Sequence, residues 1–119
     1  MAHIALPDSS INEARAKKLP GYFADTAIPA MIMAMVRMNG YWDTKTLATK
    51  LVGGANVMKA QASFNIGQRN VEAVKGILRQ HNLILKAEDT GGNISRTVTI
   101  DADTGTILQH TPGRDDITL

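Results

Sequence analysis

The sequence predicts a single mixed α/β domain, and three observations support this class. Its 119 residues suit one domain with a sizeable core. Apolar runs of strand length alternate with two segments of helical character. The last third reads as strands joined by a tight turn, a pattern typical of a meander. Strand, helix, strand, helix and then three strands suggest an α+β or layered α/β fold with about five strands.

The chain begins with "HIAL", an apolar run that we expect to be a strand. Pro7 ends the run, and the turn-forming residues 8–10 follow it. A strand placed at the start of a chain usually has structure before it, so the abrupt beginning is unusual. Residues 11–21 are polar and basic and predict a surface loop or a marginal helix.

A long helix is predicted to run from a cap at Asp25 to about Asn39. We expect Pro29 in its first turn, where a missing N–H costs least, and Gly40 as its stop. The stretch "TAIPAMIMAMVRMN" is apolar on nearly every face, with Arg37 as its only charge. This pattern favours burial on several sides, although the rest of the chain offers little material to cover it. A pliant methionine-rich binding face is the alternative.

The second half of the chain opens with a strand in "TLATKLVGG", which ends in a double glycine. A second helix fits residues 68–81, and its apolar face carries Val71, Val74, Ile77 and Leu78. Asn82 is its predicted left-handed terminator. The strands "LILKAE", "RTVTID" and "TILQ" follow, and "ADTG" joins the last two as a hairpin. From Thr111 onward the chain is polar and is expected to fray.

Composition excludes several classes of function. The longest apolar run, "AIPAMIMAMV", is too short to span a membrane, and no signal segment precedes it. The net charge is only +2, and aromatic residues make up 4% of the chain, so a nucleic-acid surface has little support. The sequence contains no cysteine, which excludes disulfides, thiolate metal sites and a cysteine nucleophile within these residues.

Few residues stand out as chemical candidates. The three histidines share no metal-ligand spacing, and His81 and His110 have ordinary helix-end and surface interpretations. His3 lies inside an apolar run, so it is either a half-buried structural histidine or a general base. The segments "VGGANVM" and "DTGGNISR" lack the lysine and spacing of a phosphate loop, and they indicate tight turns or close backbone approach. Ser9 and Ser10 belong to a turn rather than to a nucleophile elbow.

Five stretches, in this order, resemble the chemoreceptor glutamine deamidase family, CheD. They are "MAHIALPDS", "YFADTAIPAMIMAM", "LVGGANVM", "NIGQRNVEAVKGIL" and "AEDTGGNISRTVTIDADTG". Together they cover most of residues 1–108. No single stretch would suffice, but five in the same order make the resemblance specific.

The resemblance implies a layered αββ sandwich, related to bacterial toxins that deamidate glutamine, with its N-terminal strands missing here. It implies one deamidase domain over residues 1–110 and a flexible tail over 111–119. The implied activity is hydrolysis of glutamine side chains on methyl-accepting chemotaxis receptors in the cytoplasm, without a cofactor or metal. The implied partners are the cytoplasmic parts of these receptors and a CheC-type phosphatase, with no nucleic acid and no insertion into the membrane.

The family's catalysts are a cysteine, a histidine and a threonine. His3 matches the histidine, which makes it the implied catalytic residue. The cysteine and threonine belong to a "GLGSC"-like segment upstream of it, and this chain has no such segment. By resemblance the chain is a deamidase, but it lacks the cysteine nucleophile. The alternative is an inactive module that binds the receptor or the phosphatase. Asn93 and Arg96 are weaker candidates for the border of the substrate cleft; a structural turn and a surface salt bridge are their alternatives.

The missing segment predicts a feature of the coding DNA. If Met1 is an internal or mis-assigned start, the reading frame should continue upstream without a stop. We expect it to encode a Gly-Ser-Cys or similar about 10–20 residues before His3, the length of two short strands and a turn. Sequencing the upstream DNA checks this expectation. An in-frame stop directly before Met1, with no cysteine codon in any nearby frame, would favour the binding module instead.

Overall fold

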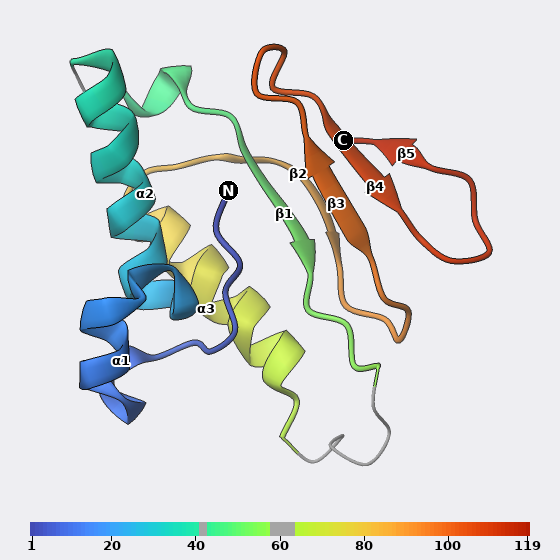
Figure 1. The fold of residues 1–119 in the computed structure, drawn as a ribbon, viewed down its shortest axis with the longest axis horizontal. Helices are drawn as coiled ribbons and strands as arrows, with labels where there is room; N and C mark the ends of the chain where they lie inside the picture. The colour runs from blue at the N-terminus through green and yellow to red at the C-terminus, as the bar shows by residue number, and fades with distance from the viewer. Residues whose placement is uncertain (41–42, 58–63) are drawn as a thin grey trace.

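Helices and strands gather on opposite sides of the molecule (Figure 1). The computed structural model describes residues 1–40, 43–57 and 64–119. In chain order its main elements are α1 (Glu13–Lys18), α2 (Ala24–Asn39), β1 (Thr49–Gly53), α3 (Ile66–Gln80), β2 (Leu85–Thr90), β3 (Thr97–Ile100), β4 (Ile107–His110) and β5 (Ile117–Thr118). The mixed α/β class is therefore confirmed. No helix in the described ranges has the length and apolar character needed to cross a bilayer.

The five strands form two sheets in the described residues. β1 and β2 pair in parallel, with α3 between them in the chain, and β3, β4 and β5 form an antiparallel sheet. The chain leaves the first sheet through Gly91 and Gly92, whose φ angles are +77° and +73°. Two successive left-handed residues turn the backbone sharply, and only glycine adopts this conformation without strain. This turn directs β3 into the second sheet.

A pair of glycines allows α3 to approach the end of β1. A Cβ added to Gly67 would lie 2.3 Å from the carbonyl oxygen of Gly54, which real side chains essentially never do. Gly54 also has a φ of +66°, and a Cβ there would lie 2.5 Å from Val71. Here the expectation of close backbone approach at "VGG" is confirmed. The first turn of α3 is thereby held against the β1 end of the sheet.

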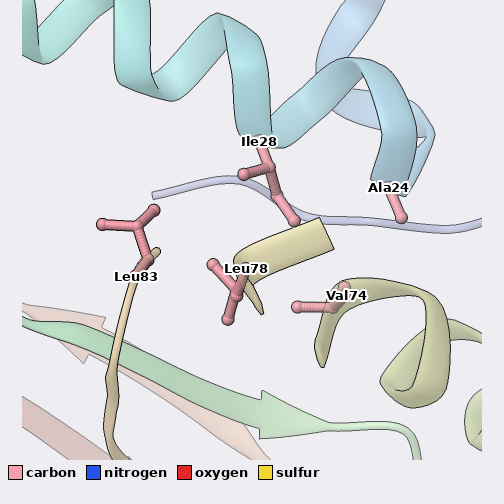
Figure 2. Close-up of a cluster of buried hydrophobic side chains, with 5 residues drawn as sticks. All are labelled: Ala24, Ile28, Val74, Leu78 and Leu83. Atoms are coloured by element: carbon pink, nitrogen blue, oxygen red, sulfur yellow. The ribbon is translucent and has the colours of Figure 1, made fainter. Parts of the chain in front are cut away.

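The hydrophobic core lies between α2, α3 and the chain that follows α3. Figure 2 shows its fully buried members, which are Ala24, Ile28, Val74, Leu78 and Leu83. Partly buried side chains from the first sheet and the N-terminal segment (residues 1–6) pack against them, among them Ile4, Leu51 and Leu85. Because Val74 and Leu78 are four residues apart, they share one face of α3, as the apolar periodicity predicts. Asn82 follows with a φ of +55° as the predicted left-handed terminator.

The N-terminal segment is not the strand that "HIAL" predicts. Only Leu6 forms an isolated bridge, with Phe23. The amides of Ala5 and Leu6 both donate to the Tyr22 carbonyl, at 2.9 and 3.1 Å. An apolar run becomes a strand only where a neighbouring strand accepts its ladder of hydrogen bonds, and β1 pairs only with β2 among the described residues. Figure 1 shows the segment running between the helices and β1.

Three expectations for α2 are also corrected. The helix begins two residues earlier, with Phe23 as its N-cap, and Asp25 in the first turn instead accepts hydrogen bonds from Ser9. Pro29 lies beyond the first turn, inside the helix. Only the first half of α2 is buried. Its four methionines are exposed by 38–81%, because the core cluster engages the helix only as far as Ile28 and partly at Ile32.

The polar end of the chain also departs from the expected frayed tail. Thr111 is buried, and β5 pairs with β4 through Ile117 and Thr118. The amide of Leu119 donates to the Ile107 carbonyl at 2.9 Å. Polar composition alone did not reveal these partners, which are supplied by β4.

The contact between Gly54 and Gly67 predicts unequal effects of two alanine substitutions in one helix. Gly67→Ala should lower the free energy of unfolding by about 1–3 kcal/mol, because the new methyl group meets backbone that cannot rotate away. Gly76→Ala is the matched control, since its Cβ would meet only the end of Arg79 at 4.0 Å. It should be neutral or raise stability by up to about 1 kcal/mol through helix propensity. Urea unfolding of both variants checks this; equal stabilities would contradict the close approach.

Candidate active site

His3 opens onto a cavity of about 410 Å³ that we call the His3 cavity. Four parts of the fold meet there. They are the N-terminal segment with Met1–Ile4, β1 with the glycines after it, the face of α3 that carries Asn70, Val71 and Val74, and the start of the second sheet with Arg96, Val98 and Ile107. The His3 side chain is exposed, so the interpretation as a half-buried structural histidine does not describe it. Segments far apart in sequence thus meet around the His3 cavity and place the imidazole at its opening.

The cavity walls are apolar with cationic groups among them. Valine and isoleucine side chains come from α3 and the second sheet, while Lys50 and Arg96 carry the positive charges. No carboxylate is among the described lining residues. Lys50 donates from Nζ to the Leu119 carbonyl, which ties β1 to the end of the chain.

Arg96 is held by several hydrogen bonds at once. Its guanidinium binds Asp89 in a bidentate manner, Nε to Oδ2 at 3.1 Å and Nη2 to Oδ1 at 2.9 Å. Nη1 donates to the Gly91 carbonyl at 2.9 Å. The Arg96 side chain is 12% exposed and the Asp89 side chain 35%, so the guanidinium is shielded from water while the carboxylate keeps partial contact with it. Arg96 borders the cavity and at the same time fixes the glycine turn.

The other weak candidate, Asn93, lies apart from His3. It is exposed in the loop between β2 and β3 and is not among the residues that line the His3 cavity. The structure therefore brings Arg96 to His3 but leaves Asn93 outside.

Asp89 joins Arg96 to a second polar group from β4. The Gln109 amide donates from Nε2 to Asp89 Oδ2, and Gln109 is 1% exposed. The same nitrogen also reaches the Thr111 hydroxyl at 3.3 Å. Hydrogen bonds first from Arg96 and then from Gln109 hold the pKa of the Asp89 carboxyl below its ordinary value of 3.8. The carboxylate thus links the first sheet to the second.

A second, smaller cavity of about 330 Å³ adjoins the first and shares Gly54 and Val71 with it. Its other described lining residues are mostly glycines and neutral polar residues, among them Asn56, Gln68 and Thr90. The amide of Asn56 donates to the Gly92 carbonyl at 2.8 Å, which holds the two glycine-rich loops together. In the described part of the chain, no group of three histidine, cysteine or acidic side chains is placed to hold a metal ion.

Sequence reasoning missed Asn70, which touches the segment that carries His3. Asn70 Nδ2 donates to the Ala5 carbonyl at 3.0 Å, across 65 residues of sequence. The available signal was a polar residue on the packing side of α3, since Asn70 is one turn before Val74. Asp89 and Gln109 were missed as well, because nothing in their strands showed that they would meet.

Comparison with known proteins gives a consistent result. A family described as "CheD chemotactic sensory transduction" matches residues 5–111. A protein of Syntrophotalea carbinolica named "Probable chemoreceptor glutamine deamidase CheD" is 45% identical over 114 residues, which are 96% of this chain and 70% of the relative. One of Thermotoga maritima named "Chemoreceptor glutamine deamidase CheD" is 40% identical over 113 residues, 95% of this chain and 68% of the relative.

The Asp89 network predicts a stability loss that depends on pH. Because the folded state lowers the pKa of Asp89, its contribution is present above the ordinary value of 3.8 and is lost as pH falls through the lower folded value. Asp89→Asn should cost about 1–2 kcal/mol at pH 7, because Arg96 and Gln109 lose a charged partner and the 35% exposure of the Asp89 side chain lets water screen part of the effect. The difference from wild type should shrink below pH 4 or so.

Glu88→Gln is the matched control for this test. Glu88 pairs with Lys75 at 2.7 Å and is about as exposed as Asp89, at 41% against 35%, but its cation is more exposed than Arg96, at 33% against 12%. An exposed ion pair of this kind contributes under about 1 kcal/mol. Urea unfolding from pH 3 to 7 measures both variants, and an Asp89→Asn loss no larger than the Glu88→Gln loss would contradict the network's role.

Proposed function

The chain belongs to the CheD family, and from this membership we propose that it takes part in deamidating glutamine side chains of chemotaxis receptors, which yields glutamate and ammonia. The observation that carries the proposal is the exposed imidazole of His3 at the His3 cavity. Family resemblance assigns the catalytic role to this histidine, and the geometry gives it access to a substrate side chain.

The arrangement of layers supports the finer assignment of fold. In Figure 1 the helices lie on one side, β1 and β2 come next, and the sheet of β3, β4 and β5 lies on the side away from the helices. We propose that this is the layered αββ sandwich of CheD and the toxin deamidases. Residues 1–110 would be its deamidase domain, with the β4–β5 hairpin extending that domain into the last nine residues.

The proposed chemistry needs a nucleophile besides His3. A primary amide is a poor electrophile, so a thiolate attacks its carbon while His3 protonates the nitrogen that leaves as ammonia. His3 then removes a proton from water, whose oxygen attacks the thioester and releases glutamate and the thiol. The imidazole also favours the thiolate form of a neighbouring cysteine. Each proton that His3 gives in the first step is recovered in the second.

These 119 residues contain no cysteine, so the thiolate has to come from outside them. We propose that a cysteine-bearing segment enters the His3 cavity beside β1, because there the imidazole is accessible and the surrounding walls are largely apolar. Without the thiolate, His3 has only water to activate. Loss of one member of such a catalytic unit lowers the rate by about three to six orders of magnitude.

Arg96 serves this site indirectly in our proposal. Its donors are engaged by Asp89 and by the Gly91 carbonyl, so its role is to line the His3 cavity while holding the glycine turn of the adjoining smaller cavity. Asn93 is exposed near the same loop and would meet only the outer part of a bound receptor. Neither residue needs to touch the reacting amide.

The partners follow from the family alone. We propose that the substrate is the cytoplasmic part of a methyl-accepting receptor and that the protein acts in the cytoplasm. A CheC-type phosphatase would compete for the same surface. The reaction as written uses no cofactor.

The second candidate function is a binding module that docks on the receptor or the phosphatase without turnover. The absence of cysteine from the sequence favours it. The two candidates differ in what they require of His3, because docking does not depend on proton transfer.

We expect the 119-residue chain alone to release no ammonia from a receptor fragment above background. A fusion with the cysteine-bearing N-terminal segment of a CheD relative should convert glutamine to glutamate. His3→Ala in the fusion should lower that rate by about three orders of magnitude or more. Ammonia release and a mass gain of one dalton on the receptor, a gain that follows from replacing –NH₂ by –OH, measure turnover.

Cysteine→Ala in the fused segment is the control for contaminating activity. His110→Ala is a matched control for the histidine, because His110 is exposed and pairs with Asp116 at 2.7 Å away from the cavity lining. It should leave the rate unchanged. A folded fusion that binds the receptor without turnover would reject the deamidase in favour of the binding module.

A further inference from the structure

We propose that Asn70 is a positioning residue, which fixes the segment that carries His3 against α3. The inference rests on the proposed role of His3 in deamidation. It starts from the bond between Asn70 Nδ2 and the Ala5 carbonyl, at 3.0 Å. Within the described ranges, this is the only side-chain hydrogen bond between α3 and the N-terminal segment.

In the described part of the chain, Ala5 is the first residue whose backbone is fixed by hydrogen bonds, and we call its peptide group the pivot of the segment that carries His3. On one side the amides of Ala5 and Leu6 are bound to Tyr22, and the Leu6 carbonyl accepts from Ala24 at 2.9 Å. On the other side the Ala5 carbonyl accepts from Asn70 and, in residues 1–40, 43–57 and 64–119, from no other group. Among the described residues, positions 1–4 make no backbone hydrogen bond. The direction in which His3 leaves Ala5 therefore depends on the Asn70 amide together with the packing of Ile4 against the core.

The distance from pivot to imidazole is short enough to transmit small shifts. His3 is two residues from Ala5, or about 7 Å along an extended chain. A displacement of about 1 Å at a catalytic group commonly costs two orders of magnitude in rate. Freeing the Ala5 carbonyl would let residues 1–4 swing at the mouth of the cavity that both His3 and Asn70 line.

The other half of the Asn70 amide shows that the residue does not simply serve stability. Its Oδ1 is buried and finds no hydrogen-bond partner in the part of the chain that the structure describes. Turning the amide over would not relieve this, because two oxygens would then face each other at Ala5. A buried acceptor without a partner costs folding free energy, and an apolar side chain of similar size would avoid that cost. Asparagine at position 70 is thus less favourable for folding than leucine would be. This favours a role in positioning the His3 segment.

The test uses Asn70→Leu in the 119-residue chain, with nuclear magnetic resonance and thermal unfolding as readouts. We expect the Tm to change by less than about 4 °C, since the lost hydrogen bond is offset by removal of the buried acceptor. The order parameters of the His3 and Ile4 amides should fall to below about 0.6, the range of flexible backbone. Their values in the unchanged chain should be close to those of α3, because the Ala5 pivot holds them.

Gln68→Leu is the matched control. It makes the same type of change on the same helix, where Gln68 binds only Glu72 and does not line the His3 cavity. It should leave the order parameters of residues 2–4 unchanged. Should Asn70→Leu not fold, Asn70→Asp gives the same shape without the donor and should mobilise the same residues.

Unchanged order parameters in a folded Asn70 variant would overturn the proposal, and so would a large fall in Tm without any change at His3. These readouts do not use turnover, so they separate the two proposals. If the cysteine fusion is inactive but Asn70→Leu frees His3, the positioning role stands and the deamidase proposal fails. If the fusion is active and the variant leaves His3 ordered, only the positioning role fails.

Discussion

The carboxylate of Asp89 is the group on which the two sheets depend. No backbone ladder joins β1 and β2 to the sheet of β3, β4 and β5 in the described residues. Asp89 at the end of β2 instead receives Arg96, which precedes β3, and Gln109 of β4. Charge-assisted hydrogen bonds of this kind are strong and directional. Together with the bond from Lys50 to the Leu119 carbonyl they tie the two sheets to each other, and the Arg96 side chain, through the Gly91 carbonyl, holds the turn that borders the smaller cavity.

The helical side of the His3 cavity depends on close packing rather than on charge. Gly54 and Gly67 bring α3 against the end of β1, so that Asn70 and Val71 reach the cavity. Farther along α3, Val74 and Leu78 anchor the first half of α2 (Figure 2). The position of α3 is thus set by small residues where it meets β1 and by large apolar residues where it meets α2. The His3 segment lies between these two contacts, which is why a distant helix determines its position.

The chain belongs to the family, but its 119 residues do not supply every group that the proposed reaction needs. The match over residues 5–111 includes the glycine turns, the α3 sequence and the segment after Asp89. These parts build the cavity and its walls. The thiolate of the proposed reaction is a different requirement, which these residues do not meet. The fold can hold an imidazole in place without any part of the covalent chemistry, because its stability comes from the core, the sheets and Asp89.

The sequence by itself determined the α/β class, the register of α3, the stop at Asn82 and the close approach at Gly54, because these depend on periodicity and on backbone angles within a few residues. It also singled out His3 through resemblance. Only the tertiary structure decided that "HIAL" is not a strand, that the methionines of α2 are exposed, and that Asp89, Arg96 and Gln109 meet. Pairing partners, cover for an apolar face and buried polar networks are relations between distant segments, and no local pattern contains them.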